Sequence, residues 1–313
     1  MTGPPTSSRP PTPFGHLSRE APDRAPDRAP DRAPDRRALC RLRRAPYVLV
    51  VDPYSGCDLG CVLCSAPLRV FPRPGLALSR FLARHAKRVR GGWARIGRAC
   101  DAYPLAEDSY GATRAILEEL ASAGLGVEIF TRSRRVLRDL DLLRSLAKRD
   151  AVRVTVKIPP APRAVTVALE PGATPAPDRF ALVAELARLG IPAGVEATPV
   201  MPGFGDDRRS LGHLICAADE AGARYVRVTP LRLEARVRPQ LLVRLAELDT
   251  QGAERVLRCF GRRPWSPRFA ERVETTAQSL RTLYRVPGEP TLPTPALPSR
   301  RDFPTQLALF GAA

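Results

Sequence analysis

Short apolar segments alternate with longer helical patterns through the middle of this sequence, and this alternation limits the fold more than any other feature. Six segments rich in apolar or β-branched residues are predicted to be strands, at residues 47–52, 93–98, 127–131, 152–158, 193–199 and 225–229. Helical patterns occupy residues 78–90, 109–123, 137–149, 179–189 and 208–221. Neighbouring parallel strands need a crossover connection, which is usually a helix. The repeats therefore predict an α/β fold in which a parallel sheet is curled into a partial (β/α)6 TIM-type barrel.

The composition changes at both ends of this barrel region, which is expected to span residues 39–235. Residues 1–38 are rich in Pro and Arg and repeat Ala-Pro-Asp-Arg four times in succession. Proline blocks regular structure and the repeat has little to bury, so this arm is predicted to be disordered. Residues 236–285 are expected to form a helical extension, and residues 286–313 a Pro-rich linker with a short apolar tail.

Three cysteines follow the first predicted strand on one short loop. The segment Cys57-Asp58-Leu59-Gly60-Cys61-Val62-Leu63-Cys64 has the spacing C-x3-C-x2-C. A [4Fe-4S] cluster normally takes four protein thiolates, so a loop with three leaves one iron open to a small chelating molecule. The alternatives are a zinc site with Cys40 as fourth ligand, or three unrelated cysteines. Zinc takes four ligands, and the three histidines of the chain lie far from this loop in the sequence.

In barrels of this type the chemistry lies at the carboxyl ends of the strands, which is where the cysteine loop falls. The same edge is expected to collect residues that follow the later strands: Cys100, Asp101, Tyr103, Arg132, Ser133, Lys157, residues 201–205 and Arg232. Cys216 and Cys259 lie on predicted helices, where they are expected to pack as small hydrophobic residues.

The net charge of the 313-residue chain is +18, and part of this excess is concentrated in one block. Residues 65–100 contain nine Arg or Lys residues and no acidic residue. Such a block beside the cysteine loop favours nucleic acid as a partner, with a plain solvated helix face as the alternative. No segment is apolar enough to span a bilayer or to be a signal, and the seven cysteines show no disulfide-like pairing. We therefore expect a cytoplasmic protein without a membrane partner.

Several segments besides the cysteines resemble the spore photoproduct lyase-like branch of the radical S-adenosylmethionine (SAM) superfamily, whose members are often labelled DNA repair photolyases. That branch has Asn-Pro-Tyr-x-Gly-Cys before its cluster loop, and residues 52–57 here read Asp-Pro-Tyr-Ser-Gly-Cys. Further similar segments follow in the family order at residues 100–107, 131–133, 136–143, 169–172 and 199–203. The resemblance covers roughly residues 46–235.

This resemblance implies that Cys57, Cys61 and Cys64 bind a [4Fe-4S] cluster, that SAM chelates its open iron, and that SAM is split reductively to start radical chemistry. Leu63 stands where the family usually has an aromatic residue near the adenine of SAM. The residues expected to contact SAM are Leu63, Asp101, Arg132, Ser133, Lys157 and Glu170. For Asp101 and Glu170 the alternative is a plain ion pair, and for Arg132 and Lys157 it is a substrate phosphate.

In spore photoproduct lyases a cysteine near the position of Cys100 returns a hydrogen atom to the product radical, so the resemblance implies this catalytic role for Cys100. The alternative is a small apolar residue that closes the strand. The implied substrate is a damaged or modified base in nucleic acid, which must be flipped out or single-stranded to reach such a site. The implied electron donor is a flavodoxin or ferredoxin. Two other functions stay open: radical modification of RNA, a peptide or a metabolite, and a non-catalytic iron–sulfur protein that binds DNA.

The segment Gln306-Leu307-Ala308-Leu309-Phe310 resembles the Gln-Leu-x-Leu-Phe peptide with which bacterial replication and repair proteins dock on the sliding clamp. A tail that follows a Pro-rich linker can place Leu309 and Phe310 in a groove at a low ordering cost. The alternative is an apolar tail that covers its own barrel.

Overall fold

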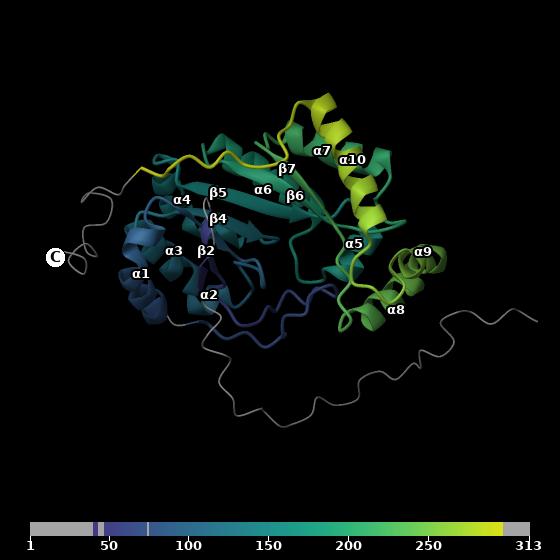
Figure 1. Cartoon of the computed structure of the whole chain (residues 1–313), viewed down its shortest axis with the longest axis horizontal. Coiled ribbons are helices and arrows are strands. Elements are labelled where there is room, and N and C mark those ends of the chain that lie inside the picture. Colours follow the sequence, from purple (N-terminus) through teal and green to yellow (C-terminus); the bar gives the residue numbers. More distant parts are fainter. Residues whose placement is uncertain (1–39, 43–46, 74, 297–313) are drawn as a thin grey trace, which may run out of the picture. The chain divides into compact units, whose positions relative to one another are not determined.

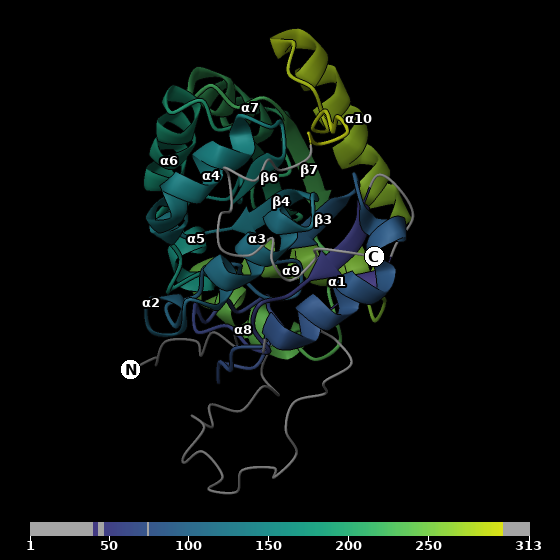
Figure 2. The same ribbon diagram turned by 90° about the vertical axis from the view of Figure 1, so that its left-hand side faces the viewer.

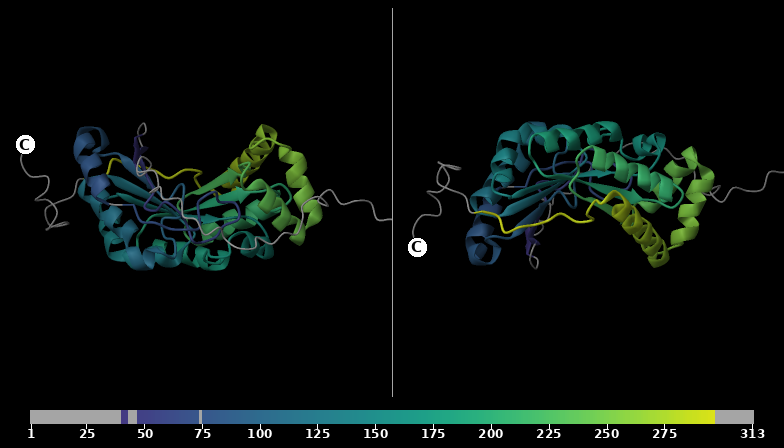
Figure 3. Two further views of the ribbon diagram at one scale, coloured as in Figure 1. Left: turned by 90° about the horizontal axis from the view of Figure 1, so that it is seen from below. Right: turned by 90° about the horizontal axis from the view of Figure 1, so that it is seen from above.

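The computed structural model describes residues 40–42, 47–73 and 75–296. It contains one seven-stranded sheet whose strands are paired in sequence order, β1 (Cys40–Leu42), β2 (Tyr47–Val51), β3 (Trp93–Ile96), β4 (Gly126–Thr131), β5 (Val152–Ile158), β6 (Ala193–Val200) and β7 (Val226–Pro230). β2 to β7 are parallel, and β1 is antiparallel to β2. Because β7 does not return to pair with β1, the sheet is an open, partial barrel (Figures 1 and 3).

Helices connect the strands from β2 to β7, and further helices follow β7. They are α1 (Gly75–Val89), α2 (Glu107–Tyr110), α3 (Ala112–Ser122), the 3-10 helix η2 (Arg134–Asp139), α4 (Leu140–Ala147), α5 (Arg163–Leu169), α6 (Ala176–Arg188), α7 (Arg208–Glu220), α8 (Arg238–Leu248), α9 (Thr250–Phe260) and α10 (Pro267–Tyr284). α3, α4 and α6 pack against β4, β5 and β6, and α10 packs against α7 and β7 (Figure 2). No helix of the described residues is long and apolar enough to cross a membrane.

The fold class and all six parallel strands are confirmed, with strand ends within two residues of the prediction. The helix predicted at residues 109–123 is broken into α2 and α3, because Gly111 adopts a left-handed conformation with φ of 59°. The helix predicted at residues 137–149 begins earlier, as η2, since Ser133 accepts a hydrogen bond from Arg135 N and so caps it. The edge strand β1 and the short helix α5 were not predicted. The disordered arm at residues 1–38 and the clamp-binding peptide at residues 306–310 lie outside the described residues.

Polar side chains line the concave face of the sheet, whereas apolar side chains face the helices. Glu128 on β4 is the centre of this lining, because its carboxylate pairs with Arg95 and Arg227 and accepts from the Thr155 hydroxyl. Trp93 and Tyr225, both buried, fill the amino end of the concave face. Open space is therefore left toward the carboxyl ends of the strands.

Residues 286–296 cross the concave side of the sheet at the amino ends of the strands (Figure 3). Val226 N donates to Pro287 O at 2.8 Å, Arg153 Nε to Thr291 O at 3.1 Å and Trp93 Nε1 to Pro293 O at 2.8 Å. We call residues 286–296 the strap. The strap joins β7, β5 and β3 on the face opposite α3, α4 and α6, in the stretch that the composition marks as a linker.

Candidate functional site

The cysteine loop leaves β2 at the carboxyl edge of the sheet and is fastened on several sides. Asp58 accepts hydrogen bonds from Leu105 N and Ala106 N at 2.7 and 2.8 Å. Three backbone bonds of 2.9 Å join the loop to neighbouring segments: Cys57 N to Pro67 O, Val62 N to Leu169 O and Gly172 N to Leu59 O. The loop backbone therefore has a defined position before any ligand binds.

The Asp-Pro-Tyr segment before the loop connects it to the next strand. Asp52 Oδ1 accepts from Arg98 N and Ala99 N at 3.1 and 3.0 Å. The Tyr54 hydroxyl donates to Glu107, whose side chain is fully buried. Two of the segments that carry the family resemblance therefore bond to each other, and their side chains hold the loop against the end of β3.

A cavity of about 160 Å³ lies at this edge, and all three cysteines of the loop line it. Most residues predicted for the site meet here, so the lining comprises Cys57, Leu59, Cys61, Leu63, Cys64, Arg98, Ala99, Cys100, Asp101, Arg132, Lys157 and Glu170. Ser133 is not part of it, because its hydroxyl caps η2. Arg98 also lines the cavity, although the sequence pattern marks it only as part of the basic block. Its place at the end of the second predicted strand is the sequence feature that could have assigned it to the carboxyl edge of the sheet.

Two buried carboxylates in the lining hold Arg132 in position. Asp101 accepts from Arg132 N at 2.7 Å and from the Thr131 hydroxyl at 2.6 Å. Glu170 accepts from Arg132 Nε at 2.7 Å and from Arg179 Nη2 at 2.5 Å. Burial alone would raise the pKa of Glu170, but the two arginines outweigh burial and the pKa is lowered. Both carboxylates are occupied by protein donors, and Arg132, which lines the cavity, is held by its ion pair with Glu170.

Lys157 supplies the second cation of the cavity. Its Nζ donates to Gly97 O at 3.2 Å and lies 5.5 Å from the centre of the Phe130 ring. Burial, together with the nearby charge of Arg132, lowers the pKa of Lys157. An anionic ligand between these two side chains would offset their mutual repulsion.

The cysteine thiols are strongly affected by burial. Burial raises the pKa of Cys57 to about 11, with a further contribution from Asp101. Burial also raises the pKa of Cys61 to about 12, against an opposing effect of Arg132. The surrounding protein thus favours the neutral thiols, so binding of a metal at either sulfur would be coupled to loss of its proton.

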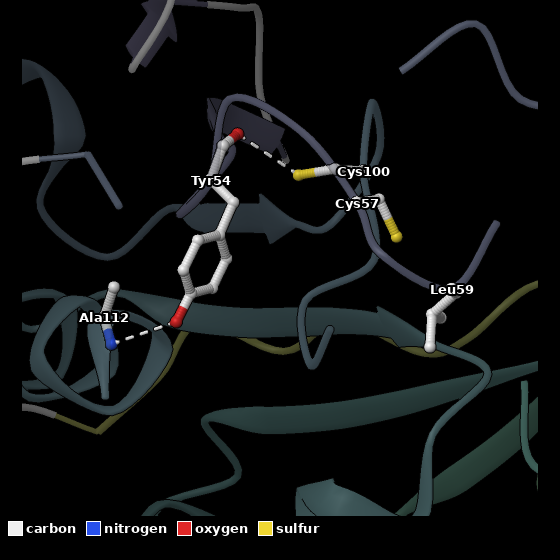
Figure 4. Close-up of a cluster of buried hydrophobic side chains, with 5 residues drawn as sticks. All are labelled: Tyr54, Cys57, Leu59, Cys100 and Ala112. Carbon is white, nitrogen blue, oxygen red and sulfur yellow. Dashed lines mark hydrogen bonds between the residues drawn. The ribbon is translucent and has the colours of Figure 1, made fainter. Parts of the chain in front are cut away.

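Cys100 lies beside the cysteine loop without belonging to it (Figure 4). Its side chain is buried, and its Sγ donates to Tyr54 O at 3.3 Å. Burial, followed by the charge of Asp52, raises the pKa of this thiol above its usual range. Cys100 therefore lines the cavity as a neutral thiol whose S–H group is directed at Tyr54 O.

No protein-family model matches the chain. Among curated proteins, it is 28% identical over 283 residues to the uncharacterized protein Rv2578c of Mycobacterium tuberculosis, covering 85% of this chain and 82% of that protein. The uncharacterized protein Mb2609c of Mycobacterium bovis is similar to the same extent.

Among solved structures, the chain resembles a spore photoproduct lyase variant with bound AdoMet and dinucleoside spore photoproduct. The TM-score is 0.62 at 16% identity, covering 81% of this chain and 78% of that chain. A second variant of the same enzyme gives a TM-score of 0.62 at 14% identity, with 80% and 78% covered. The chain therefore has the fold of spore photoproduct lyase, and the resemblance drawn from its motifs is confirmed at the level of the fold.

Proposed function

We propose that this protein is a radical SAM enzyme that holds a [4Fe-4S] cluster on Cys57, Cys61 and Cys64. The observation that carries the proposal is the meeting of all three loop cysteines in one cavity, at the edge of a fold shared with an AdoMet-binding enzyme. When bound, the cluster and SAM supply reductive cleavage of the sulfonium and hydrogen abstraction from carbon.

The donor set of the cavity suits an iron–sulfur cluster, because three thiols from one loop line it. Among the residues that the structure describes, no three His, Cys, Asp or Glu side chains are grouped around one ion position. A four-iron cube carries each thiolate on a different iron, so its ligands need not converge. Iron also provides the positive charge that the buried thiolates of Cys57 and Cys61 lack in the protein alone.

The chain's own residues suit the polar and apolar parts of SAM. Arg132 and Lys157 would face its carboxylate, while Asp101 and Glu170 act as positioning residues because their oxygens hold Arg132. Leu63 borders both the cysteine cavity and a small hollow of about 10 Å³ lined by apolar residues such as Met201. Ser133 would act only through its cap on η2.

The substrate we propose is a damaged or modified base in nucleic acid. The main support for this proposal is the distribution of positive charge on the protein. In residues 65–100, as far as the structure describes them, only Arg95 and Arg98 form ion pairs with carboxylates. The basic residues of α1 are exposed, and none of them forms an ion pair with a carboxylate that the structure describes. A second support is that the similar lyase structure contains a dinucleoside photoproduct.

Replacing Arg84, Lys87 and Arg88 together by glutamine is expected to flatten the salt dependence of nucleic-acid binding. Each neutralised phosphate contributes about 0.9 to the slope of log K against log salt on duplex DNA, so the loss should approach about 3 units. Fluorescence anisotropy over a salt series measures it. The control is Arg144, Lys148 and Arg188 replaced by glutamine, an equal loss of charge on α4 and α6. Equal slopes for both triple variants would leave α1 as a solvated face.

The test of the whole proposal is anaerobic reconstitution followed by reduction and detection of 5'-deoxyadenosine, with and without DNA. Production that rises with ultraviolet-irradiated or single-stranded DNA supports the nucleic-acid substrate. Production that DNA does not change supports the radical chemistry alone and removes the support for that substrate. No production under any condition contradicts the enzyme assignment.

Cys100→Ala is expected to leave iron content and SAM cleavage unchanged while altering the products. Cys100 lines the cavity but lies outside the cysteine loop, and its weak S–H bond suits hydrogen-atom return. In heavy water, the exchanged thiol of the wild type should place deuterium in the product, and the variant should not. The Cys216→Ala variant, altered on α7, is the control. Unchanged products and deuterium content would make Cys100 a packing residue.

The remaining partners are proposed from the sequence. A flavodoxin or ferredoxin would supply the electron, and the peptide of Gln306, Leu307, Leu309 and Phe310 would bind the sliding clamp. Pull-down of the clamp by this peptide, lost on Leu309→Ala and Phe310→Ala, tests the second partner. A reducing cytoplasm is the proposed location, in keeping with the free cysteines of the described residues.

A further inference from the structure

A second, larger cavity lies at the same edge of the sheet as the cysteine loop. Its volume is about 480 Å³, within the usual range for small-ligand sites. It is formed by the loop after β6, by α9 and by the first turns of α10, which lie beyond the carboxyl end of β6 (Figure 1). The lining comprises Pro202, Gly203, Asp206, Arg255, Cys259, Ser266, Arg268, Phe269 and Arg272.

Three arginines and one carboxylate give this cavity an excess of positive charge. Asp206 is occupied, because it accepts from Gly203 N at 2.7 Å and from Arg272 Nη2 at 2.6 Å. Arg255 and Arg268 form no ion pair with any carboxylate that the structure describes. Two guanidinium groups on one cavity are thus left without an anionic partner.

The loop after β6 is shaped to bring Arg255 across it. Gly203 has φ of +80°, a conformation that other residues rarely adopt. A Cβ at this position would lie 3.2 Å from Arg255 Cδ, closer than side chains normally approach. The absence of a side chain at Gly203 therefore lets Arg255 lie over the loop, where its guanidinium faces the same space as Arg268.

We propose that this cavity binds a phosphate group. A guanidinium presents paired N–H donors that match phosphate oxygens, and two of them can hold one phosphate from two sides. The Ser266 hydroxyl adds a neutral donor. The phosphate belongs either to the backbone of a nucleic-acid strand or to the terminus of a free nucleotide. The first source rests on the proposed nucleic-acid substrate, whereas the second does not.

Binding of two probes separates these sources, a short single-stranded oligonucleotide and deoxythymidine monophosphate. The test variant is Arg255→Gln with Arg268→Gln. Its control is Arg144→Gln with Arg188→Gln, which removes the same charge from exposed positions outside the cavity. For a backbone phosphate, the test variant should lose oligonucleotide affinity and flatten the salt slope by about 0.7 units, the contribution of one phosphate on a single strand. For a terminal phosphate, it should lose affinity for the mononucleotide as well.

Cys259 gives a second readout that does not depend on charge removal. It lines the cavity and is partly exposed, whereas Cys216 on α7 is partly exposed outside it. Bound phosphate ligand should slow alkylation of Cys259 in the wild type and leave Cys216 unchanged, as followed by peptide mass spectrometry. The Arg255→Gln, Arg268→Gln variant should lose this protection.

The proposal is overturned if the test variant and its control bind both probes equally, or if neither probe protects Cys259. Both measurements use the protein without reduction or SAM. A failure here is therefore distinct from a failure to produce 5'-deoxyadenosine, which concerns the cysteine cavity alone.

Discussion

Cys61→Ala is expected to abolish bound iron and the broad visible absorption of the reconstituted protein. With two thiolates left in the loop, two of the four irons of the cluster would have no protein ligand. The backbone bonds that hold the loop do not involve the Cys61 side chain, so the fold should persist. Iron and sulfide analysis with absorption spectroscopy measures the loss, and circular dichroism checks the fold.

Cysteines that do not line the cavity of the cysteine loop provide the matched comparison for this experiment. Cys216→Ala and Cys259→Ala remove a partly exposed thiol from α7 and α9 and should retain the cluster. An intact cluster in the Cys61→Ala protein would contradict the ligand assignment. Stoichiometric zinc and no iron in the wild type would favour the zinc alternative instead.

Glu170→Gln is expected to destabilise the protein by about 3–5 kcal/mol, the usual cost of removing one partner from a buried ion pair. Arg179 is only 1% exposed, and its other donors are already bound to Lys157 O and Thr174 O. It therefore has no route to solvent when its carboxylate partner is lost. Urea unfolding measures the change in the free energy of unfolding.

An exposed glutamate gives the control for this change. Glu185 pairs with Arg134 at 2.9 Å, with the two side chains 31% and 44% exposed. Glu185→Gln should cost no more than about 1 kcal/mol, because solvent screens such pairs. Equal effects of the two substitutions would mean that the Arg132–Glu170–Arg179 group does not stabilise the fold.

The same group predicts a pH dependence. Because Arg132 and Arg179 lower the pKa of Glu170 in the folded state, the stabilisation is fully present above the unfolded value of about 4.3. It is lost as the pH falls through the lower folded value. The difference in stability between wild type and Glu170→Gln should therefore be constant near neutral pH and shrink on acidification. A difference that grows in acid would reverse the sign of the argument.

The sequence was sufficient for elements whose signal is local. Each strand from β2 to β7 is a short apolar or β-branched run, and the cysteine loop follows the first of them directly. Residues that follow strand ends, such as Cys100, Arg132 and Lys157, met in the cavity because parallel strands share one carboxyl edge.

Residues whose role depends on distant partners escaped prediction. Arg179 reads as an ordinary arginine on an amphipathic helix, yet its partner Glu170 and its acceptor Lys157 O come from other elements. Ser133 shows the opposite error, because a serine after a strand is equally suited to cap the helix that follows. The second cavity is formed by the loop after β6 together with α9 and α10. No local sequence pattern predicts that these three segments meet.

The strap also bears on the order in which the protein can be completed during synthesis. Trp93 and Pro293 are 200 residues apart in the chain, and the hydrogen bond between them lies at the amino end of the barrel. Contacts of such long range form late, because loop closure must come first. The cysteine loop and the strands around its cavity emerge from the ribosome well before the strap. A nascent chain can therefore present a formed cysteine loop and its cavity while the opposite end of its barrel still lacks the closing segment.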